Sequence, residues 1–129
     1  MDKLKLILLI IIMLSYKPAY SEELSSNFEL SVNIQKIKQI EGDIFVNLFQ
    51  IDEEYANWQN IVDIQKQTFK VNDKNMMVTF KNLIKGKYGI RVFQDLNKNA
   101  ELDKTQKNFP KEPIGFSKNP SLMKGQPKP

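Results

Sequence analysis

The chain has 129 residues, a formal net charge of +4, no cysteine and no histidine. This length is typical of one domain. The composition excludes Ser-His-Asp and Cys-His catalysis within the chain, and it excludes zinc or haem sites that use His or Cys ligands. Carboxylate, amide, hydroxyl and lysine chemistry remains. Hard cations such as calcium are the metals that oxygen ligands of this kind prefer.

The N-terminal residues predict export. Lys3 and Lys5 precede an apolar run over residues 6–14, and Ser21 is a suitable residue before a cleavage point. The apolar run is shorter than the about 20 residues that a membrane span needs. We therefore expect residues 1–21 to be a signal peptide that meets the membrane only transiently, and the mature chain to be periplasmic or secreted in a bacterium.

The charge of the mature chain argues against nucleic acid as a partner. Removing residues 1–21 takes away three lysines and one aspartate, which lowers the formal charge to +2. Arg91 is the single arginine, and lysines and acids are interspersed along the sequence. Nucleic-acid-binding domains carry a concentrated basic surface instead. We expect a protein or glycan partner at the cell envelope.

Alternating apolar residues predict the first strands. Residues 22–27 are polar and predict a flexible lead-in. Residues 28–35 alternate in a period of two and predict a strand with one buried face. Residues 43–50 predict a second strand, and Gly42 suits the turn between them. The sequence therefore predicts that these two strands form an antiparallel hairpin.

The middle of the chain is less regular. Residues 61–71 predict a strand whose Gln and Lys side chains point outward, residues 72–75 predict a turn, and residues 77–80 predict a further strand. Trp58 allows two interpretations. It is either a stacking platform for a carbohydrate or a large side chain that covers the open end of the core.

Gly86 and Tyr88 predict the corner of a sandwich. In a tyrosine corner, the hydroxyl group hydrogen-bonds to the backbone just upstream and fixes the arch between two sheets. Several short strands, Gly and Asn turns and no long helical pattern favour an all-β protein. We expect an immunoglobulin-like or transthyretin-like antiparallel β-sandwich with Greek-key connections over residues 28–119, followed by a Pro-rich irregular tail over residues 120–129.

The loop after this corner has the spacing of a calcium-binding loop. Asp95, Asn97 and Asn99 stand at positions 1, 3 and 5 of such a loop. Glu101 would offer its backbone carbonyl at position 7, and Asp103 stands at position 9. These five residues are the predicted metal ligands, with calcium as the cofactor.

Two positions depart from the calcium pattern. Ala100 stands at position 6 in place of Gly, and positive φ at this residue costs about 1–2 kcal/mol. Gln106 stands at position 12, so the acid is missing there unless Glu112 arrives from further along. The predicted dissociation constant is on the order of 10⁻⁴–10⁻³ M. The alternative is an Asx-rich turn that caps backbone amides without metal, and the sequence leaves both open.

Three motifs together resemble the bacterial exported family of domain of unknown function 2141. They are Gly86-x-Tyr88, the segment 92–103 and the segment 110–117, and the resemblance covers residues 28–119. It implies an immunoglobulin-like or transthyretin-like sandwich with no established activity. Ala100 and Asn108 stand where the family pattern has glycine.

The resemblance also implies a final strand after residue 117, which this sequence does not favour. Pro120, Pro127 and Pro129 disfavour a strand in the last residues. We therefore expect the sandwich to lack its last strand, which would leave a sheet edge open to pairing with another chain.

Three functions are consistent with the sequence. The leading hypothesis is a non-catalytic binding or structural module whose loop is stabilised by calcium. The second is a hydrolase that uses the carboxylates Asp95, Asp103 and Glu112, because paired acids can carry out acid–base catalysis when they are about 5–10 Å apart. The third is a truncated, non-functional paralogue.

Overall fold

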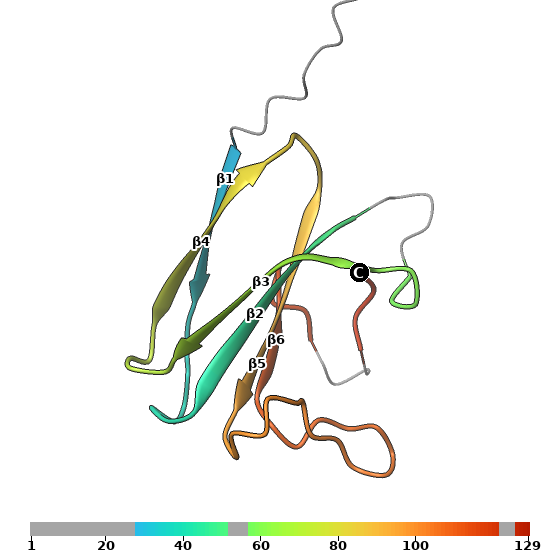
Figure 1. Ribbon diagram of the computed structural model, residues 1–129. Helices are drawn as coiled ribbons and strands as arrows, with labels where there is room; N and C mark the ends of the chain where they lie inside the picture. Colours follow the sequence, from blue (N-terminus) through green and yellow to red (C-terminus); the bar gives the residue numbers. More distant parts are fainter. Residues whose placement is uncertain (1–27, 52–56, 122–125) are drawn as a thin grey trace, which may run out of the picture.

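The computed structural model describes residues 28–51, 57–121 and 126–129. These residues form two antiparallel sheets and no helix, so the predicted all-β class is confirmed (Figure 1). The predicted signal peptide and lead-in, residues 1–27, lie outside the described part. No helix among the described residues is long and apolar enough to cross a membrane. The strands are β1 (Phe28–Ile34), β2 (Asp43–Gln50), β3 (Asp63–Lys70), β4 (Met76–Leu83), β5 (Tyr88–Asp95) and β6 (Ile114–Phe116).

The core lies between the sheet β1-β4 and the sheet β3-β2-β5-β6. Alternate side chains of β2, Ile44, Val46 and Leu48, are buried and belong to the same core cluster as Val78 and Phe80 of β4. Side chains that alternate along a strand point to opposite faces, and only one face of β2 meets the other sheet. The predicted strand over residues 43–50 is confirmed.

The predicted hairpin between the first two strands is wrong. β1 pairs with β4, with Leu30 opposite Phe80, and β2 lies in the other sheet. The connection over residues 35–42 leads from one sheet to the other. Within it, the backbone N–H of Ile37 donates to the carbonyl of Lys74 at 3.1 Å. Alternation identifies the buried face of a strand but carries no information about which strand lies beside it.

The glutamines of β3 point toward the other sheet, which corrects the predicted outward orientation. The side-chain amide of Gln65 donates to the carbonyl of Lys81 at 2.9 Å, and that of Gln67 donates to the carbonyl of Thr79 at 3.0 Å. The lysines of β3 are exposed, as predicted. Side-chain amides therefore connect β3 to β4 where no backbone ladder joins the two sheets.

Tyr88 makes the contact that a tyrosine corner requires. Its hydroxyl donates to the carbonyl of Ile84 at 2.6 Å, across the turn that leads from β4 into β5. The side chain also packs against the core. This hydrogen bond fixes the start of β5, the strand that ends at Asp95.

A glycine holds the other end of β5 close to a neighbouring turn. Gly42 has a φ of +69°, and a Cβ atom at this position would lie 2.0 Å from the backbone oxygen of Asp95. Only glycine tolerates both this conformation and this approach. The turn before β2 and the end of β5 are therefore in direct contact.

The edge of β1 is less covered than the middle of the core. Leu30, Val32 and Ile34 are half-buried and Phe28 is exposed. A groove of about 520 Å³ lies between β1 and residues 115–119, which include the end of β6. Within the described residues, β1 has β4 as its single strand neighbour.

We predict that Tyr88→Phe lowers the free energy of unfolding by about 1–2 kcal/mol, because the carbonyl of Ile84 loses its hydrogen-bond donor while the ring remains. Urea denaturation of the variant measures this change. Thr68→Val removes an exposed hydroxyl group and is the matched control. Equal stabilities of Tyr88→Phe and the unmodified protein would contradict the role given to this hydroxyl.

Candidate functional site

Asp95 occupies the end of β5 and is 1% exposed. Its Oδ1 accepts the backbone N–H groups of Lys98 at 2.7 Å and Asn99 at 3.3 Å, and its Oδ2 accepts that of Ala100 at 2.8 Å. Burying a carboxylate is costly unless donors surround it. The three backbone donors compensate for this cost, and they wrap the following loop around Asp95.

Three residues of the loop region adopt the left-handed conformation. Lys98, Ala100 and Asn108 each have a φ of +62°. The positive φ expected at Ala100, where calcium loops and the family pattern have glycine, is therefore present. Asn tolerates this conformation better than Ala, for which it costs about 1–2 kcal/mol. The bond between the Ala100 N–H and Asp95 helps to offset this cost.

The remaining predicted metal ligands meet one another. Asn97 Oδ1 accepts the N–H of Asn99 at 3.2 Å, and Asn99 Oδ1 accepts the N–H of Glu101 at 2.9 Å. The side-chain amides of Asn97 and Asn99 both donate to Asp103 Oδ2, the latter at 3.2 Å. These are the contacts of successive Asx turns. Amide orientation follows from hydrogen bonding, so a cation among these groups would require the two amides to turn their oxygens inward.

Glu112 reaches the loop from the segment before β6. Its Oε1 accepts the backbone N–H of Leu96 at 2.9 Å, and its Oε2 accepts that of Asp103 at 3.2 Å. The side chain is largely buried. A single carboxylate therefore holds together the backbone at Leu96 and at Asp103. In the described ranges no three acidic side chains cluster as a metal site, so a cation here would depend on amide and carbonyl oxygens.

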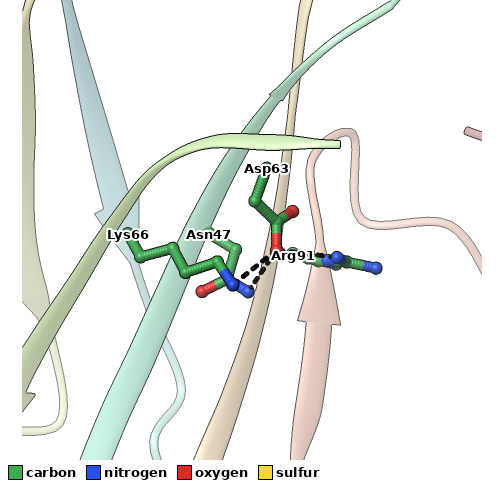
Figure 2. A network of polar contacts seen from close by, with 4 residues as sticks. All are labelled: Asn47, Asp63, Lys66 and Arg91. Carbon is green, nitrogen blue, oxygen red and sulfur yellow. Dashed lines mark hydrogen bonds and ion pairs between the residues drawn. The ribbon is translucent and has the colours of Figure 1, made fainter. Parts of the chain in front are cut away.

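A second polar cluster lies on the outer face of the four-stranded sheet, and it was not predicted from the sequence. Asp63 Oδ2 accepts from Arg91 Nη2 at 2.7 Å and from the Asn47 amide at 2.9 Å, and Lys66 Nζ lies 3.6 Å away (Figure 2). The Asp63 side chain is only 5% exposed. Its Oδ1 has no hydrogen-bond partner among the described residues.

The strand register explains how this cluster assembles. Asn47 of β2 lies opposite Lys66 of β3 on one side and opposite Arg91 of β5 on the other. A register shift in the β2–β3 ladder brings Asp63 onto the same face. The one sequence signal was Arg91, the single arginine of a lysine-rich chain. Arginine is the usual choice for a partly buried ion pair.

Trp58 packs at the same end of this face. Its ring lies 5.3 Å from that of Phe49 and 5.6 Å from that of Phe116, measured between ring centroids. The guanidinium carbon of Arg91 lies 5.8 Å from the centroid of the Trp58 ring. Three neighbours therefore hold the indole in place, on the outer side of the sheet.

A groove of about 240 Å³ runs over the outer face. Its floor is formed by side chains of β2, β5 and β6, including Arg91, and its sides by Leu102, Lys104 and Gln126. Asp95, Asp103 and Glu112 do not line this groove, nor the groove of about 520 Å³ beside β1 or a further one of about 730 Å³ near Trp58. The loop thus contributes an apolar and a cationic side chain to the groove, while the carboxylates of Asp95 and Glu112 accept backbone N–H groups and that of Asp103 accepts Asn side-chain amides.

Two packed antiparallel sheets place the chain among small all-β proteins. It belongs to the family described as "Uncharacterized protein conserved in bacteria (DUF2141)", whose profile matches residues 32–129. The family resemblance predicted from three motifs is confirmed. The matched range contains the loop, the Asp63 cluster and the groove of about 240 Å³ on the outer face. No curated protein and no solved structure matches the chain.

We predict that Glu112→Gln destabilises the protein by about 1.5–3 kcal/mol, because a neutral amide can accept only one of the two backbone N–H groups that the carboxylate accepts. Urea denaturation measures the loss. Faster hydrogen exchange at the amides of Leu96 and Asp103 would locate it. Glu101→Gln, at an exposed position of the same loop, is the control and should change neither quantity.

Proposed function

We propose that this protein is an exported, non-catalytic module of the bacterial cell envelope, with an immunoglobulin-like or transthyretin-like sandwich fold and Greek-key connections. Its partner is a protein or a glycan. The partner binds to the outer face of the four-stranded sheet, between the loop of residues 95–112 and Trp58.

The orientation of the carboxylates supports a binding role over catalysis. A general acid or base must reach a substrate at hydrogen-bonding distance. Asp95 and Glu112 instead use both oxygens to accept backbone N–H groups of their own loop. The rival hydrolase would need Asp95, Asp103 and Glu112 to line a cleft, and the grooves of about 240, 520 and 730 Å³ are lined by other side chains.

The chemistry of the outer face supports this placement of the binding surface. The floor of the groove is largely apolar, and Arg91 and Lys104 give it positive charge. Asp63 and Trp58 hold Arg91 in one position. Side chains that are fixed before binding lose little entropy when a partner arrives.

To test the surface, the chain without residues 1–21 is screened against bacterial glycans and envelope proteins. Lys104→Glu should weaken binding to the partner found by about tenfold, which corresponds to about 1.4 kcal/mol. Lys74→Glu, in an exposed turn outside the groove, should not. Equal binding by both variants would place the partner elsewhere. Turnover of a glycan that Asp103→Asn abolishes would favour the hydrolase.

We further propose that calcium stabilises the loop through Asp95, Asn97, Asn99, the Glu101 carbonyl and Asp103. The support is the spacing of these residues, the positive φ of Ala100 and the convergence of both Asn side chains on Asp103. A site with a dissociation constant of about 1 mM would add about 1.4 kcal/mol of stability at about 10 mM calcium.

Thermal unfolding with calcium and with a chelator tests this. We expect a cooperative transition whose midpoint rises by a few degrees in calcium. Asp103→Asn should remove the calcium response, whereas Asp73→Asn, which alters a different Asx turn, should retain it. The same midpoint in calcium and chelator would show that the loop is an Asx-rich turn alone. The absence of a cooperative transition in every condition would support the truncated paralogue.

A further inference from the structure

The segment of residues 126–129 is hydrogen-bonded to Trp58. The indole N–H of Trp58 donates to the backbone carbonyl of Pro127 at 2.5 Å, although the two residues are 69 positions apart in the sequence. In Figure 1 the C-terminus correspondingly lies close to the segment that follows residue 57. The segment has the sequence Gln-Pro-Lys-Pro and is the last part of the predicted Pro-rich region. From here on, the tail means these four residues.

A groove of about 730 Å³ separates the tail from the end of the sheet. Four aromatic residues line it, together with aliphatic and lysine side chains, and so do Pro127 and Pro129 of the tail. Proline rings are apolar and flat, and they pack well on aromatic side chains. The aromatic residues are Phe49, Trp58, Tyr88 and Phe116.

The polar groups of the groove suit a proline-rich segment. Proline has no backbone N–H, so an extended proline-rich segment presents carbonyl acceptors without donors that need partners. Trp58 supplies the matching donor from an otherwise apolar ring, and it already bonds a proline carbonyl. Recognition of proline-rich segments by other domains uses grooves lined in the same way.

The donor is fixed in direction before any segment binds. Phe49 and Phe116 flank the Trp58 ring, and Arg91 lies over it. Arg91 is in turn held by Asp63 at 2.7 Å. The Asp63 cluster is therefore a support that positions the indole, which gives a role to an ion pair that takes no part in the core.

We propose that the Trp58 groove is a recognition site for extended proline-rich polypeptide segments, and that the tail is its tethered occupant. This deepens the proposed binding function, on which it rests, by naming the class of partner. A segment on the same chain as its binding site has an effective concentration that is commonly in the millimolar range. An external segment of similar sequence must therefore compete with the tail.

Trp58 is the only tryptophan of the chain, so its fluorescence reports on the groove directly. Pro127→Gly combined with Pro129→Gly removes both rings from the tail. This double variant should shift Trp58 emission to longer wavelength and increase its quenching by acrylamide. Lys128→Ala changes the residue between the prolines and should leave both signals unchanged.

A peptide with the sequence of residues 121–129 is then titrated into each protein. It should bind the double variant about tenfold more tightly than the unmodified chain, because the competing tail is weakened. The same peptide with glycine at both proline positions should not bind. Trp58→Phe added to the double variant keeps an aromatic ring without the N–H, and calorimetry should show that it binds the peptide more weakly than the double variant does.

Two outcomes would overturn the proposal. Unchanged emission and quenching in the double variant would mean that the tail does not cover Trp58. The second outcome is a double variant that exposes Trp58 and yet fails to bind the proline peptide at peptide concentrations well above the millimolar range. In that case the tail would be a packing segment only. If binding to an envelope partner still depended on Lys104 in either case, the proposed function would stand and this inference alone would fall.

Discussion

The buried carboxylate of Asp95 is the interaction on which one whole end of the molecule depends. Three backbone N–H groups surround it, and the carbonyl of the same residue rests against Gly42 in the turn before β2. Replacing the carboxylate would leave these part-buried donors without their acceptor, and a donor left unpaired away from water costs more than a typical hydrogen bond contributes. The loop that borders the outer groove is therefore built outward from a single strand end.

An acidic side chain stabilises each of the two ends of the outer face. At one end Glu112 ties the loop together, and at the other Asp63 holds Arg91 against Trp58. Each is a largely buried acid that joins two segments of the chain, Glu112 to Leu96 and Asp63 to Arg91. A buried ion pair contributes little net stability, since desolvation consumes most of the attraction. Its effect here is to restrict the orientation of the side chains that line the groove.

Local patterns in the sequence predicted local features well. Alternation of apolar residues predicted β2, and the Gly86-x-Tyr88 spacing predicted the hydrogen bond of the Tyr88 hydroxyl. Ala100 stands at a position where calcium loops have glycine, and this predicted its positive φ. Each of these depends on residues a few positions apart. The physical rule behind each, a period of two or a left-handed residue, acts within one strand or turn.

Contacts between segments that are distant along the chain were not predicted from the sequence. The pairing of β1 with β4 depends on a crossover whose buried residue, Ile37, gives no local signal. The Asp63 cluster requires the register of three strands at once. Glu112 was recognised as an acid that could reach the loop, but its acceptance of two backbone N–H groups follows from the placement of β6 beside β5.

The glutamine contacts between β3 and β4 make the seam between the sheets sensitive to chemical ageing. Backbone ladders are the same for almost any sequence, whereas this seam depends on two side-chain amide groups, those of Gln65 and Gln67. Deamidation converts such an amide to a carboxylate and replaces its N–H donors with an oxygen. That oxygen would face a backbone carbonyl across the seam, so the loss of one ammonia molecule would turn an attraction between the sheets into a repulsion.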